Sequence, residues 1–125
     1  MKAYSDSHGA VVEIDFSDYP KCVLPAYHKF MTDTSRFVLL KGGAGSGKSV
    51  ACVQKGIYRC FTEPGHTWLV TRKVGSSLRD SCYAEIVRVL DEYNLTQFCE
   101  IAESNLIIRI PVTGAKILFK GLDDV

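Results

Sequence analysis

Eight consecutive residues have the types and spacing needed to hold a phosphate group. They fit the pattern G-x-x-x-x-G-K-[ST] and are Gly42, Gly43, Ala44, Gly45, Ser46, Gly47, Lys48 and Ser49. Glycines let backbone N–H groups face a phosphate where side chains would block it, and Lys48 adds a charge for the β- and γ-phosphates. The Ser49 hydroxyl is suited to Mg²⁺. We therefore expect a P-loop (Walker A loop) that binds ATP and Mg²⁺ through residues 42–49, with Lys48 also acting in catalysis and Ser49 as metal ligand.

The elements on either side suit such a loop. The preceding residues, Arg36 to Lys41, include a four-residue apolar run that predicts a buried parallel strand. The following apolar residues recur at helical spacing and predict a helix that begins near Gly47 and ends near Thr62. Its N-terminal N–H groups and dipole would point at the same anion. A glycine-rich connector without a ligand is the alternative, which both flanks disfavour.

A second predicted strand, Thr67 to Thr71, completes a right-handed βαβ unit. Arg72 and Lys73 follow at its carboxyl end, which in a parallel sheet lies on the ligand side. Both cations are therefore candidates for contact with the phosphates, and exposed surface charges are an equal alternative. A second helix is expected from about Ser77 to Asn94.

The last third of the sequence is rich in β-forming residues. Residues 106–110 and 116–119 predict an antiparallel hairpin, and Cys99 to Ala102 a further strand. An apolar run followed by Asp123 and Asp124 resembles a Walker B strand, but three residues separate the run from the acids. We therefore favour a turn at 121–124, with Walker B as the alternative.

Ahead of the loop, residues 1–19 are expected to form a partly mobile N-terminal segment, with a short strand within 11–16, and residues 20–125 the domain. Pro25 suits the first turn of a short helix that ends near Met31. Tyr27 and His28 are candidates for stacking on an adenine base, with ordinary packing as the alternative.

Composition indicates a single globular domain. Of the 125 residues, 46% are hydrophobic and 23% charged, and we expect neither a membrane span nor a signal peptide. The five cysteines form no C-x-x-C pair, so we expect reduced and mostly buried thiols. The net charge of +1 is unevenly distributed: residues 36–88 carry nine Lys or Arg and three Asp or Glu, a local charge of +6. This excess is consistent with an anionic ligand, and equally with a solvated basic face.

Three stretches together resemble the N-terminal ATPase region of the large terminase subunit of tailed phages. They are residues 40–49, residues 70–73 with 77–81, and the hairpin that ends at residues 119–124. The resemblance implies an ASCE-type ATPase core in an α/β fold, with Gly42 to Ser49 binding ATP and Mg²⁺ and Arg72 near the γ-phosphate. Many relatives have arginine at the position of Ala44, and no glutamine precedes the loop to contact adenine. It also implies that the Walker B acids and a nuclease domain lie beyond Val125, so that these residues alone would bind ATP with little hydrolysis.

The function implied by this resemblance is DNA packaging. The full protein would form a homo-oligomeric ring in the cytoplasm of a bacterial host, with double-stranded DNA, portal protein and small terminase subunit as partners. Two alternatives remain open at this point: a small P-loop kinase that transfers the γ-phosphoryl group of ATP, and a non-catalytic nucleotide-binding module.

Overall fold

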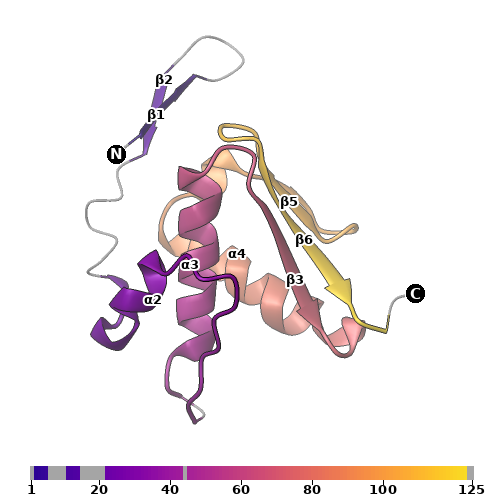
Figure 1. Cartoon of the computed structure of the whole chain (residues 1–125). Helices are drawn as coiled ribbons and strands as arrows, with labels where there is room; N and C mark the ends of the chain where they lie inside the picture. The colour runs from indigo at the N-terminus through magenta and orange to yellow at the C-terminus, as the bar shows by residue number, and fades with distance from the viewer. Residues whose placement is uncertain (1, 6–10, 15–21, 44, 124–125) are drawn as a thin grey trace.

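A four-stranded mixed sheet forms the centre of the protein, in the order β3-β6-β5-β4 (Figure 1). The computed structural model describes residues 2–5, 11–14, 22–43 and 45–123. The strands of this sheet are β3 (Thr67–Arg72), β4 (Glu100–Ala102), β5 (Ile107–Ile110) and β6 (Ala115–Gly121). Strands β3 and β6 are parallel, and the other two pairs are antiparallel. A separate antiparallel pair is formed by β1 (Lys2–Ser5) and β2 (Val11–Ile14).

The helical elements follow the predicted order. They are η1 (Pro25–Tyr27), α2 (His28–Thr32), α3 (Lys48–Thr62), η2 (Gly75–Ser77), η3 (Arg79–Tyr83), α4 (Ala84–Glu92) and η4 (Thr96–Phe98). The helix after the loop ends at Thr62, as expected. The second long helix has an irregular start, because a 3₁₀ turn at η2 and a π turn at η3 precede α4. No helix in the described part of the chain combines the length and apolar character needed to cross a membrane.

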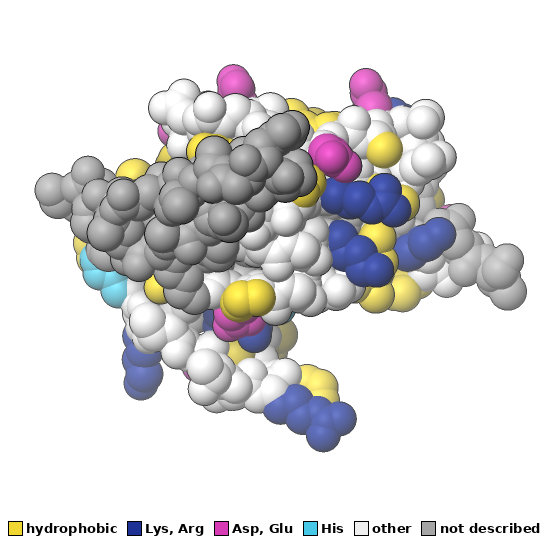
Figure 2. Space-filling view, turned by 90° about the horizontal axis from the view of Figure 1, so that it is seen from above, with side chains coloured by type: hydrophobic (Ala, Val, Ile, Leu, Met, Phe, Trp, Pro, Cys, Tyr) yellow, Lys and Arg dark blue, Asp and Glu magenta, His cyan; other side chains and the backbone are white. Residues whose placement is uncertain are grey.

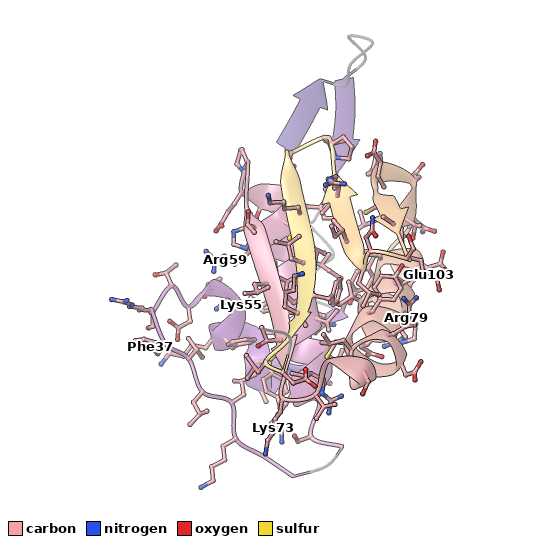
Figure 3. The ribbon with its side chains drawn as sticks, turned by 90° about the vertical axis from the view of Figure 1, so that its right-hand side faces the viewer. Phe37, Lys55, Arg59, Lys73, Arg79 and Glu103 are labelled. Atoms are coloured by element: carbon pink, nitrogen blue, oxygen red, sulfur yellow. The ribbon has the colours of Figure 1, made fainter. Side chains whose placement is uncertain are left out.

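The hydrophobic core lies between one face of the sheet and the helices α3 and α4 (Figure 3). Alternation along β6 explains this, since Ile117 and Phe119 are buried while Lys116 and Lys120 are exposed. Figure 2 shows Lys and Arg side chains gathered on the side of the molecule where the sheet lies. The largest fully buried side chains are Phe61, Ile57, Leu78, Ile86, Leu90, Ile108, Ile110, Ile117, Val89 and Cys60.

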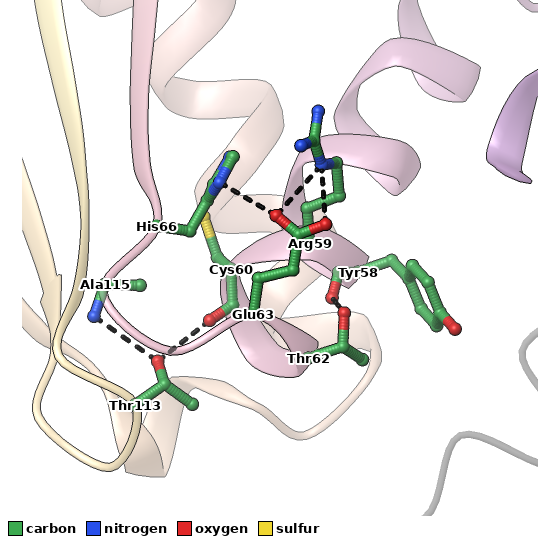
Figure 4. A network of polar contacts seen from close by, with 8 residues as sticks. All are labelled: Tyr58, Arg59, Cys60, Thr62, Glu63, His66, Thr113 and Ala115. Carbon is green, nitrogen blue, oxygen red and sulfur yellow. Dashed lines mark hydrogen bonds and ion pairs between the residues drawn. The ribbon is translucent and has the colours of Figure 1, made fainter. Parts of the chain in front are cut away.

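The end of α3 is fastened to the turn between β5 and β6 (Figure 4). The buried Thr113 hydroxyl donates a hydrogen bond to the Cys60 carbonyl oxygen (2.8 Å) and accepts one from the Ala115 amide (3.3 Å). The Gly65 amide donates to the Thr113 carbonyl oxygen at 2.8 Å. These bonds hold α3 across the sheet, and so fix the direction in which its N-terminus points.

Two predictions about the sheet are wrong. Residues 36–41 form no strand, and Phe37 and Leu39 are 84% and 91% exposed. Without a strand at 36–41, the described residues form no βαβ unit around the loop, and the parallel pair of the mixed sheet is β3–β6. Strand β3 pairs with β6 along one edge only, and residues 36–41 do not pair with its other edge, so they lack the ladder hydrogen bonds that define a strand. The predicted antiparallel hairpin and the strand near Cys99 are confirmed as β5–β6 and β4.

The prediction of mostly buried thiols is also wrong. Cys60 is buried, Cys82 and Cys99 are partly exposed, and Cys22 and Cys52 are exposed. The five cysteines are reduced thiols, as expected.

Candidate functional site

The loop before α3 has the backbone shape that its glycines allow. Gly45 and Gly47 have positive φ angles of 77° and 85°, and Gly47 is the residue that caps α3. A residue with a Cβ is strained in this region of backbone space. The helix then begins at Lys48, and its first amides face the loop. Ala44 lies outside the described residues.

The interior of the loop holds a polar atom without a hydrogen-bond partner. The Ser46 Oγ is buried, and no group in the described part of the protein bonds to it. A Cβ placed on Gly42 would come within 2.8 Å of this oxygen, so Gly42 leaves the space that the hydroxyl uses. Lys48 folds back and donates from its Nζ to the Gly42 carbonyl oxygen, and the Ser49 side chain is exposed. A buried hydroxyl, the first amides of a helix and a lysine are donors suited to an anion, so these residues fit a nucleotide phosphate. A Mg²⁺ bound with that nucleotide would find an oxygen ligand in the Ser49 hydroxyl.

Tyr27 supports the loop from the preceding helical turn. Its hydroxyl donates to the Ser46 carbonyl oxygen at 2.7 Å, and its ring lies near Gly47. His28 Nε2 lies 2.9 Å from the Val23 carbonyl oxygen. Adenine stacking by Tyr27 or His28 stays a prediction, while the bond from Tyr27 to the loop is a contact that sequence analysis did not anticipate.

A cavity of about 440 Å³ adjoins the loop. Lys48 and Ser49 contribute polar groups to its wall, together with Ser81 and Glu85 from the helical region after β3. The apolar part of the wall comes from α2, the segment before the loop, α3, β3 and the helical region after β3, through Phe30, Val38, Leu40, Cys52, Val53, Trp68, Val70, Cys82 and Ile86. The cavity therefore joins the predicted phosphate loop to the region that follows β3.

Arg72 lies at the carboxyl end of β3, which is the end of the sheet where the loop lies. It is exposed, and its Nη1 donates to the Ser81 hydroxyl. Lys73 is also exposed, and Figure 3 shows it at this same end. A direct contact of either cation with a phosphate stays a prediction.

Asp123 has a structural contact. Its Oδ1 accepts a hydrogen bond from the Gly75 amide at 2.8 Å, so it fastens the end of β6 to η2. Leu122 and Asp123 lie in a turn, as the favoured interpretation expected, and Asp124 lies outside the described residues.

Ser81 was not singled out as a site residue by sequence analysis. Its position depends on the π turn, in which the Tyr83 amide bonds to the Leu78 carbonyl oxygen (2.8 Å). A regular helix with 3.6 residues per turn would direct Ser81 elsewhere. The polar run before the periodic residues of α4 was the available signal, and it does not specify a π turn.

Comparison with known proteins gives a consistent assignment. Residues 34–125 match the family described as phage terminase large subunit. The PBSX phage terminase large subunit of Bacillus subtilis (strain 168) is 35% identical over 88 residues, which are 70% of this chain and 20% of that protein. The terminase large subunit of Bacillus phage SPP1 is 30% identical over 87 residues, again 70% of this chain and 20% of that protein. The chain thus spans about a fifth of the length of these relatives, and it belongs to the phage terminase large subunit family.

Proposed function

We propose that this chain provides the ATP-binding loop of a DNA-packaging motor. In this proposal residues 42–49 hold the phosphates of ATP, and Ser49 holds Mg²⁺. Hydrolysis by the complete subunit then drives double-stranded DNA into the procapsid. The observation that supports it best is the buried, unpartnered Ser46 hydroxyl beside the N-terminus of α3, in a family of terminase large subunits. Family membership favours this function over a small kinase.

The partners of the complete protein are part of the proposal. It would act as a homo-oligomeric ring in the cytoplasm of the bacterial host, with portal protein, the small terminase subunit and DNA. Arg72 would act in turnover near the γ-phosphate, and Tyr27 would lie near the base. The carboxylates that hold the metal and orient the attacking water would come from outside residues 1–125.

The test is calorimetry of residues 1–125 with a non-hydrolysable ATP analogue and Mg²⁺. Lys48→Ala removes a charge-assisted contact worth about 1.5–3 kcal/mol, so we expect affinity to fall roughly 10- to 150-fold. Lys29→Ala is the matched control, because Lys29 is an exposed cation on α2 and its loss changes the net charge equally. Equal affinities for the Lys48→Ala and Lys29→Ala variants would contradict the proposed function.

A further inference from the structure

Arg72 differs from the arginines on the helices in what it contacts. Arg59, Arg79 and Arg88 each form an ion pair with a glutamate, at 3.1, 3.6 and 2.7 Å. Arg72 donates to the Ser81 hydroxyl, and no carboxylate in the described part of the chain lies within ion-pair distance of it. A hydroxyl is neutral, so it orients the guanidinium without compensating its charge. The guanidinium also keeps further N–H donors for an anion.

Both ends of this contact are held by ordered backbone. The Arg72 carbonyl oxygen accepts a hydrogen bond from the Leu122 amide at 2.8 Å, which extends the β3–β6 pairing past the strand end. Ser81 lies in the π turn between Leu78 and Tyr83, both of which are buried. The position of the hydroxyl is therefore fixed by the core.

The contact lies next to the proposed phosphate site. Ser81 contributes to the same 440 Å³ cavity as Lys48 and Ser49. Arg72 contacts Ser81, which lines this cavity. The contact thus places the end of β3 beside the cavity that the loop residues Lys48 and Ser49 also line.

We propose that Ser81 is a positioning residue that holds Arg72 ready to contact the γ-phosphoryl group of a nucleotide bound in the loop. This inference rests on the proposed function. Fixed donors are effective where charge develops in the transition state, because they need no reorganisation as the reaction proceeds. The π turn gives Ser81 this position, as π turns often do at functional sites.

The experiment uses the complete terminase large subunit that carries this sequence. Ser81→Val and Ser81→Thr form a matched pair, since the two side chains have the same shape and threonine keeps the hydroxyl. We expect Ser81→Val to lower kcat about three- to tenfold with KM changed less than twofold, and Ser81→Thr to restore most of the loss. Ser104→Ala removes an exposed hydroxyl in the turn before β5 and controls for loss of a serine.

A double-mutant cycle separates positioning from structure. Affinity for ADP with aluminium fluoride, a mimic of the γ-phosphoryl group in transfer, should fall about three- to tenfold in Ser81→Val and fall further in Arg72→Ala. In the Arg72→Ala background the Ser81→Val change should have no added effect. Additive losses, or equal activity of the Val and Thr variants, would overturn the positioning role. If residues 1–125 bind the ATP analogue equally well with and without the Lys48 side chain, the proposed function fails instead, whatever the outcome for Ser81.

Discussion

Gly121 at the end of β6 lies directly against the backbone of Gly75 at the start of η2. A Cβ built on Gly121 would come within 2.4 Å of the Gly75 Cα and 2.6 Å of its amide nitrogen. The Gly75 amide also bonds to Asp123 Oδ1 at 2.8 Å. The two segments therefore approach as closely as backbones can, and this contact sets the path from Arg72 to Ser81.

Gly121→Ala is expected to destabilise the protein, because a Cβ would meet the Gly75 Cα and amide nitrogen, which are backbone atoms that cannot rotate aside, as well as Asp123 Oδ1. Overpacking of this kind costs about 1–3 kcal/mol and sometimes more, so we expect a loss of at least about 2 kcal/mol and a fall in Tm of roughly 5–10 °C. Circular dichroism recorded during thermal unfolding measures the fall in Tm. Gly43→Ala is the control, since among the described residues no atom beyond its chain neighbours lies within 4 Å of its Cβ position. A Tm for Gly121→Ala equal to that of the control would mean that the segments lie farther apart.

The Thr113 hydroxyl gives a second stability prediction. Thr113→Val keeps the side-chain shape but leaves the buried Cys60 carbonyl oxygen and the Ala115 amide without this partner. Leaving such groups unpaired costs about 1–3 kcal/mol, which urea unfolding at equilibrium detects as a lower midpoint. Thr67→Val makes the same change on an exposed position of β3 and should stay within about 0.5 kcal/mol of the parent. Similar midpoints for the two variants would argue against the bond between Thr113 and α3.

Elements that depend on local pattern could be predicted from the sequence, whereas long-range pairing could not. Helix α3 follows from the spacing of Val53, Ile57 and Phe61, and the loop follows from its own glycines and lysine. The place of β6 between β3 and β5 depends on contacts across some 50 positions of sequence, which no local pattern encodes. The same limit explains the error at residues 36–41, because a strand requires pairing with a neighbour as well as a β-rich run, and these residues do not pair with β3.

The position of Ser81 shows a second limit of prediction from sequence, which concerns side-chain direction within a helix. Hydrophobic periodicity predicts a regular helix through this region, but one extra residue in the π turn changes the direction of every side chain before Ala84. The motif thus identifies candidate residues for phosphate contact. The contact between Arg72 and Ser81 depends on the π turn, which no motif in the sequence specifies.

The cysteines should differ widely in reactivity. Burial raises the pKa of the Cys60 thiol to about 12, and burial likewise raises the pKa of Cys99 to about 12. At pH 8 both are then almost wholly protonated, and the thiolate is the reactive form. Brief alkylation of the native protein with iodoacetamide, read by peptide mass spectrometry, should label the exposed Cys22 and spare Cys60 and Cys99 until urea is added.

The same pKa shifts set the direction in which the free energy of unfolding changes with pH. The folded state keeps these thiols protonated up to about pH 12, whereas an unfolded thiol ionises near its ordinary pKa of about 8.5. Between these values the folded state binds more protons, so the free energy of unfolding should fall as the pH rises. A free energy of unfolding that increases over this range, or rapid labelling of Cys60 in the native protein, would contradict the burial of the Cys60 thiol and the partial burial of Cys99.

Phe37 and Leu39 should promote self-association of residues 1–125. They are 84% and 91% exposed, and they lie in an apolar run without strand pairing. Contiguous exposed apolar groups favour association, because contact between molecules removes them from water. We expect the double variant Phe37→Ser and Leu39→Ser to shift sedimentation velocity profiles toward monomer at high concentration. The Tm should change little, because these side chains bury little surface within the molecule.

Lys41→Ser, at an exposed position next to the run, controls for the introduction of serine into this segment. If the double variant instead melts several degrees lower with its association unchanged, these side chains are buried in solution, and residues 36–41 form the strand that their sequence predicts.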